Sequence, residues 1–133
     1  MKIDHIGIAV KNLETSVSLF ESLLNSPCYK RELVESEQVE TAFFQTGESK
    51  VELLGASGPD SVISKYIEKR GEGIHHIAFE VNDIEYEMKR LQKDGYRFLS
   101  ESPKAGADNK RIVFLHPKDT NSVLVELCQS TKS

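Results

Sequence analysis

The amino-acid sequence predicts an α+β fold made of two βαβββ modules that together form one curved-sheet domain. Two phrases occur twice in the same order: residues 5–10 (HIGIAV) return at 76–81 (HIAFEV), and residues 50–54 (KVELL) return at 124–128 (LVELC). The 133 residues suit one ordinary domain, whereas each half alone, at roughly 60–65 residues, would have a marginal hydrophobic core. We therefore expect a single domain over residues 1–133, in which two duplicated halves share a core.

The first module is expected to span about residues 1–55. Residues 3–10 are rich in β-branched side chains, which favours a strand. Asn12 is a good helix cap, and apolar residues recur after it at helical spacing until Ser26-Pro27, where the helix should end. Three further strands are predicted at residues 28–35, 39–46 and 49–54.

The second module is expected over about residues 74–129, after a connecting helix at about 60–70 and a joint at Gly71-Glu72-Gly73. Asp83 should cap the helix of this module, and Gly95 should end it. Strands are predicted at residues 74–81, 96–100, 111–116 and 122–128, with a polar candidate binding loop at 103–110.

Composition and charge exclude several classes of function. The net charge of −4 argues against general affinity for nucleic acid. No apolar run approaches the roughly 20 residues that span a membrane. The N-terminus lacks a basic segment followed by an apolar stretch, so we expect no signal peptide and a cytoplasmic location. Cys28 and Cys128 have no metal-binding spacing and are expected to be reduced thiols.

Each half carries one histidine and one glutamate at matching positions: His5 and Glu52 in the first, His76 and Glu126 in the second. A single such histidine is more often a hydrogen-bonded, partly buried side chain, and a single such glutamate more often faces solvent at a strand edge. Repetition in both halves favours four ligands around one metal ion, because coordination offsets the cost of a carboxylate on an apolar strand. His75 competes with His76, but it points to the opposite face of its strand.

Two imidazoles and two carboxylates would make a neutral site with one divalent metal ion per chain. The set contains no thiolate, which disfavours a closed structural zinc site. Mixed nitrogen and oxygen ligands suit Co²⁺, Ni²⁺, Mn²⁺, Fe²⁺ or Zn²⁺, and the sequence does not choose among them. Four protein ligands leave two positions of an octahedron, where a Lewis-acidic ion could chelate two substrate oxygens.

These motifs resemble the vicinal oxygen chelate (glyoxalase/bleomycin resistance/dioxygenase) superfamily, and the resemblance covers nearly the whole chain. Within the superfamily, the sequence is most similar to the methylmalonyl-CoA epimerases, because the phrases PKAGA and FLHPKD precede the last strand. The most specific segments are residues 4–10, 51–54, 74–81, 114–119 and 123–127.

The resemblance implies metal-dependent epimerisation of methylmalonyl-CoA, an acyl-CoA substrate. A proton would leave the carbon α to the thioester on one face and return on the other, with Glu126 and Glu40 as the acid/base groups. The resemblance also implies a homodimer. Basic residues around the predicted loop could meet the phosphates of coenzyme A, although such clusters are commonly only a solvated surface: Lys104, Lys110, Arg111 and Lys118.

Three other functions use related folds. Glyoxalase I, an isomerase that acts on a hemithioacetal, would use the same four ligands. A non-catalytic small-molecule-binding protein of this fold commonly lacks a complete ligand set, whereas all four positions are filled here. An extradiol dioxygenase uses two histidines and one carboxylate around iron, so the fourth ligand counts against it.

Overall fold

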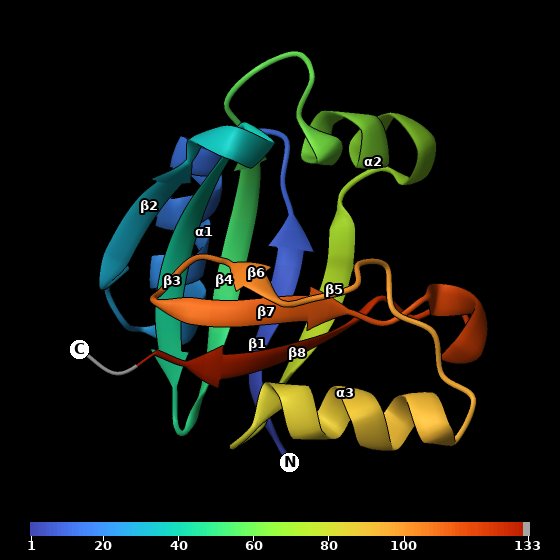
Figure 1. Cartoon of the computed structure of the whole chain (residues 1–133). Helices are drawn as coiled ribbons and strands as arrows, with labels where there is room; N and C mark the ends of the chain where they lie inside the picture. The colour runs from blue at the N-terminus through green and yellow to red at the C-terminus, as the bar shows by residue number, and fades with distance from the viewer. Residues whose placement is uncertain (132–133) are drawn as a thin grey trace. The chain divides into compact units, whose positions relative to one another are not determined.

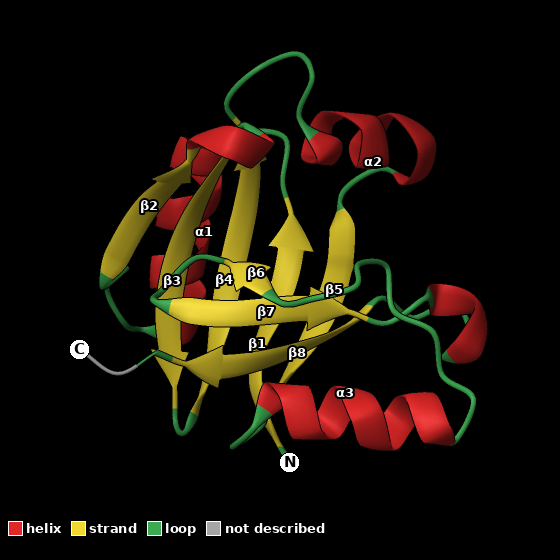
Figure 2. Ribbon diagram, in the orientation of Figure 1, coloured by secondary structure: helices red, strands yellow, loops and turns green. Residues whose placement is uncertain are grey.

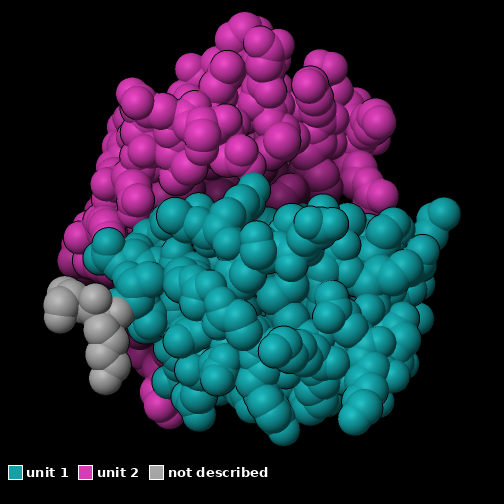
Figure 3. Space-filling model, viewed as in Figure 1, with its two compact units in different colours: residues 1–4, 76–133 teal, residues 5–75 magenta. Residues whose placement is uncertain are grey.

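The computed structural model describes residues 1–131 and confirms the α+β class (Figures 1 and 2). The chain divides into two compact units, which Figure 3 colours separately. The N-terminal unit is His5–His75, and the C-terminal unit is Met1–Asp4 together with the chain from His76 onward. The order strand, helix, three strands occurs twice, as the repeat predicted. Within the described residues, no helix is long and apolar enough to cross a membrane.

In the N-terminal unit the strands lie in the order β2-β3-β4-β1, with β4 parallel to β1 and antiparallel to β3. Helix α1 covers one face of this sheet (Figure 1), where Val17 packs with Phe44 and Leu53. Helix α2 packs on the other face, where Ile63 joins a cluster of Ala9, Val39 and Leu54. The bounds are β1 Lys2–Ala9, α1 Leu13–Leu24, β2 Lys30–Val34, β3 Val39–Thr46, β4 Ser49–Ala56 and α2 Val62–Arg70.

Helix α1 begins where the sequence predicted, because the Asn12 side chain accepts a hydrogen bond from the Thr15 amide at 3.0 Å. Its last residue is Leu24, and Asn25, directly before Ser26-Pro27, caps the helix in a left-handed conformation with φ 51°. Strand β4 continues through Gly55, beyond the predicted end of this strand at residue 54. A side chain at Gly55 would meet the Cβ of Leu13 on α1 at 3.2 Å, so glycine permits this close packing.

The C-terminal unit repeats the plan with the strand order β5-β8-β7-β6, in which β5 is parallel to β8. Helix α3 packs against one face, and its Ile84, Met88 and Leu91 join Val113 and Leu127 in a buried cluster. The bounds are β5 Gly73–Glu80, α3 Ile84–Lys93, β6 Lys104–Ala105, β7 Lys110–Phe114 and β8 Val125–Ser130.

The predicted strand at residues 96–100 is wrong. Only one isolated bridge, Phe98 to Leu115, forms there, because Tyr96 and Phe98 serve mainly to pack against the core beside α3. The missing strand of the module is β6, which pairs Lys104 with Ile112 inside the stretch that was expected to be a loop.

Residues 1–4 join the C-terminal unit through a buried ion pair. The Lys110 Nζ lies 3.4 Å from Asp4 Oδ1 and 2.8 Å from Ser130 Oγ, and Lys110 is only 7% exposed. Burial acts to lower the pKa of Lys110, but the negative charges of Asp4 and Glu80 hold it above its ordinary value. Lys110 is therefore a cation that ties the start of the chain to β7 and β8.

Candidate functional site

The face of the N-terminal sheet turned away from α1 carries the first His–Glu pair. Gly7 lies opposite Glu52 in the register of β1 and β4, so His5 and Glu52 point to the same face. The His5 Nε2 lies 3.2 Å from Glu52 Oε1, and both residues are buried. Gly7, two residues after His5 and opposite Glu52, places no side chain on this face.

The C-terminal unit presents a second pair with the same construction. Ala78 on β5 lies opposite Glu126 on β8, which places His76 and Glu126 on the face turned away from α3. The His76 Nε2 lies 3.3 Å from Glu126 Oε1, and both residues are buried. The ring of Phe114 meets the His76 ring edge-on, with centroids 5.8 Å apart, and limits its orientation.

Each pair offers one nitrogen and one oxygen donor, and this chemistry fits a divalent ion of the transition series. His5 and Glu52 belong to a group of buried side chains whose ligand atoms are close enough together to hold a metal ion. A carboxylate buried at this depth is costly without a cation or hydrogen bonds to compensate it. The residues therefore make a possible metal-binding group of histidine and glutamate.

Cys128 shares a sheet face with Glu126, but it does not add a thiolate to this donor set. Burial is the main cause that raises the pKa of its thiol well above the ordinary value, and the charges of Asp4 and Glu126 raise it further. A protonated thiol is a poor metal ligand. Both cysteines are free within the described chain, in agreement with the expected reduced thiols.

The two remaining histidines have other contacts. His75 points to the opposite side of β5 from His76, and its ring meets the Tyr66 ring at 4.8 Å. His116 caps a short 3₁₀ turn at Pro117–Asp119, since its Nδ1 accepts a hydrogen bond from the Lys118 amide at 3.2 Å.

Glu40 requires a correction, because strand alternation turns its carboxylate away from Glu52. Glu52 lies opposite Phe43 on β3, so Glu40 points to the other face of the sheet, which α1 covers. There Glu40 accepts a hydrogen bond from Arg31 Nε at 3.2 Å, and Arg31 also forms an ion pair with Glu14 on α1. The expected role of Glu40 as second acid/base therefore does not fit its position.

The expected basic cluster is also dispersed. Arg111 forms an ion pair with Glu85 of α3, on the face turned away from His76, and lowers the pKa of that carboxylate through its hydrogen bonds. Lys110 is buried with Asp4. Lys104 and Lys118 are exposed, on β6 and on the 3₁₀ turn respectively.

Residues 4–114 match the sequence model of a protein family, the Glyoxalase/Bleomycin resistance protein/Dioxygenase superfamily. The chain belongs to this superfamily. The matched residues include His5, Glu52 and His76. The paired modules of this superfamily member have the vicinal oxygen chelate fold, which confirms the expected family.

Relatives along nearly the whole length include named enzymes. An uncharacterized protein of Bacillus subtilis is 39% identical over 128 residues, which cover 96% of this chain and 91% of that protein. The ethylmalonyl-CoA/methylmalonyl-CoA epimerase of Cereibacter sphaeroides is 38% identical over 130 residues, which cover 96% of this chain and 97% of that protein. A structure of the Streptomyces coelicolor methylmalonyl-CoA epimerase in complex with 2-nitronate-propionyl-CoA has a TM-score of 0.92 at 35% identity, and the match covers 99% of each chain. These likenesses support an isomerase of the epimerase type.

Proposed function

We propose that this superfamily member epimerises methylmalonyl-CoA by removing and returning the proton at the carbon α to the thioester. One observation carries the proposal: both modules present a buried histidine and glutamate in the same register, in a chain that aligns along its length with epimerases. The complex of a related epimerase with 2-nitronate-propionyl-CoA supports an acyl-CoA as the substrate class.

His5, Glu52, His76 and Glu126 are the proposed ligands of one divalent metal ion. When bound, the ion supplies positive charge that stabilises the negative charge developing on the thioester oxygen. The two buried glutamates match this charge, so the loaded set is electrically neutral. Co²⁺, Ni²⁺, Mn²⁺, Fe²⁺ and Zn²⁺ all accept such donors, and metal analysis of the purified protein identifies the native one.

Glu126 is the proposed proton acceptor on one face of the substrate. The α C–H bond breaks, its electron pair passes into the thioester as an enolate, and the proton moves to the Glu126 carboxylate. Return of a proton to the opposite face gives the other epimer. Burial of Glu126, whose side chain is 5% exposed, keeps water away from the enolate.

The test is turnover of each methylmalonyl-CoA epimer by protein loaded with Co²⁺ or with Ni²⁺. We expect conversion in both directions, and loss of activity after removal of the metal. Activity only on the hemithioacetal of methylglyoxal would assign glyoxalase I instead. Failure to bind either ion, with no turnover, would favour a non-catalytic binding protein.

A homodimer is a further proposal, which rests on the family resemblance, and a cytoplasmic location is proposed beside it. Light scattering coupled to size exclusion measures the mass of the particle in solution against the 15.0 kDa chain. A particle with the mass of one chain would contradict the dimer. Fractionation of the producing cells tests the location.

A further inference from the structure

We infer that Glu32 on β2 is the second proton-transfer group, which acts on the face of the substrate α-carbon opposite to Glu126. The inference rests on the proposed epimerase function. It replaces Glu40, which lies on the wrong face of the sheet, with a carboxylate that lies on the face of His5 and Glu52.

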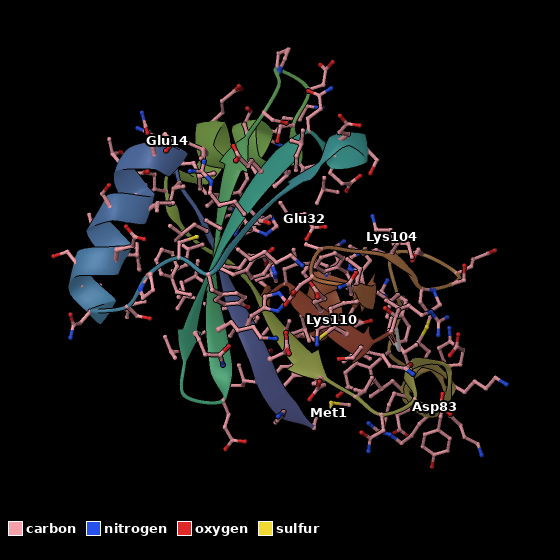
Figure 4. All side chains as sticks on the ribbon, turned by 90° about the vertical axis from the view of Figure 1, so that its left-hand side faces the viewer. Met1, Glu14, Glu32, Asp83, Lys104 and Lys110 are labelled. Atoms are coloured by element: carbon pink, nitrogen blue, oxygen red, sulfur yellow. The ribbon has the colours of Figure 1, made fainter. Side chains whose placement is uncertain are left out.

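The strand register identifies this carboxylate. Among the described strand residues of the N-terminal unit, the acidic ones are Glu32, Glu40 and Glu52. Glu52 lies opposite Phe43, and Thr41, two residues before Phe43, lies opposite Glu32. Residues opposite one another share a face, so Glu32 and Glu52 point to the same side. Figure 4 shows Glu14 on α1 and Glu32 on the other side of the sheet.

The strand register also fixes the separation of Glu32 and Glu52 along their shared face. Glu32 and Glu52 are separated by two strand spacings of about 4.8 Å and by two residues of about 3.4 Å, so their Cα atoms are about 12 Å apart. Thr41 is 2% exposed, and its hydroxyl donates a hydrogen bond to the Glu32 carbonyl oxygen at 3.3 Å, which fixes the backbone of Glu32.

Glu32 is partly exposed and lies beside a lysine on the same strand. Lys30 Nζ lies 3.6 Å from Glu32 Oε1. The side chains of Lys30 and Glu32 are 34% and 32% exposed, whereas that of Glu126 is 5% exposed. Water can therefore reach the Glu32 side chain, whereas the Glu126 side chain is shielded from water.

The C-terminal module differs at the equivalent position. There Phe114 lies opposite Glu126, and Ile112, two residues before Phe114, lies opposite Lys104. Lys104 thus has the register position of Glu32, but it carries a cation. Of these two equivalent positions, only the one in the N-terminal module carries an acidic side chain. The duplicated scaffold is therefore asymmetric at the position where a two-base reaction needs one additional carboxylate.

The proposed step is balanced for protons and electrons. In one direction Glu126 starts as a carboxylate and Glu32 as a carboxylic acid. The α-proton passes to Glu126, the C–H electron pair enters the enolate, and the Glu32 proton then forms the new C–H bond on the opposite face. In the other direction the two residues exchange roles.

Solvent deuterium exchange at the substrate α-carbon tests the assignment, with each epimer measured separately on Co²⁺-loaded protein by NMR. Glu32→Gln should slow exchange from the epimer whose proton Glu32 removes by roughly 10²–10⁴-fold, and should slow exchange from the other epimer much less. The matched control is Glu40→Gln, which removes an equivalent carboxylate from the opposite face and should leave both rates near those of the wild type.

Thermal unfolding and Co²⁺ titration of both variants report whether a change is merely structural. Wild-type exchange from both epimers in Glu32→Gln would overturn the inference, and so would equal losses for both epimers together with weaker Co²⁺ binding. A wild-type protein that exchanges neither epimer would instead overturn the proposed function, and with it the role of Glu32. The wild-type measurement thus separates the two failures.

Discussion

Replacing Lys110 with methionine should destabilise the protein by about 3–5 kcal/mol, the usual cost of removing one partner of a buried ion pair. Lys110 is 7% exposed and Asp4 is 4% exposed, and their charged atoms lie 3.4 Å apart. Without Lys110 the Asp4 carboxylate would stay buried without this cation, and Ser130 Oγ would lose its 2.8 Å contact. The side chain of methionine fills a similar volume, so the cost arises from charge rather than from a cavity.

Urea unfolding at pH 7, followed by circular dichroism, measures this cost. Lys118→Met is the matched control, because Lys118 is exposed, and it should change the free energy of unfolding by less than about 0.5 kcal/mol. The double variant Asp4→Leu with Lys110→Met should be more stable than Lys110→Met alone, since it leaves neither partner of this pair as an uncompensated buried charge. The reasoning would be refuted if Lys110→Met lowered the free energy of unfolding by less than about 0.5 kcal/mol. It would also be refuted if the losses of the single variants Asp4→Leu and Lys110→Met simply added up in the double variant.

Three other perturbations test the site and the fold. Glu52→Gln should weaken metal binding modestly, because an amide oxygen still coordinates, whereas Glu126→Gln should lower turnover more. Co²⁺ titration measures the metal affinity of each variant, and an activity assay on the same samples measures its turnover. Equal effects of the two substitutions on affinity and on turnover would contradict these separate roles. Hydrogen bonds from Arg97 lower the pKa of Asp119 to about 2, so this carboxylate stabilises the fold above its ordinary pKa of 3.8, and that contribution is lost as pH falls through 2. Arg97→Gln should therefore flatten the fall in Tm between pH 5 and pH 2, and an unchanged slope would count against it. Asn12→Ala should cost about 1 kcal/mol in thermal unfolding by removing the α1 cap, and a wild-type Tm would show that the cap contributes nothing.

Local sequence patterns predict the order of the elements and the starts of helices α1 and α3. The repeated phrases predict two βαβββ modules, and the side chains of Asn12 and Asp83 cap α1 and α3 as expected. These features depend on residues close together in the chain, which local periodicity and capping chemistry describe well. The two parallel His–Glu pairs follow from the same repeat, because equivalent positions in duplicated strands take equivalent registers.

The pairing of distant strands determines which further carboxylate lies on the sheet face of His5 and Glu52. Alternation on β3 was visible in the sequence, and it grouped Glu40 with Ala42 and Phe44. The sequence pattern alone did not predict that α1 covers the sheet face on which Glu40, Ala42 and Phe44 lie. Glu32 was missed because its face depends on the pairing of β2 with β3, although the alternation of Lys30, Glu32 and Val34 before the turn could have pointed to it.

Contacts between distant residues also determine where the short strand β6 forms. They likewise determine where Asp4, near the start of the chain, is buried. The apolar side chains near residues 96–100 suggested a strand, yet the backbone pairing occurs at β6, where Lys104 meets Ile112. Lys110 and Asp4 are 106 residues apart in the chain and form one buried pair. No local pattern encodes such a contact, because its free energy depends on burial and charge that exist only after distant segments have packed together.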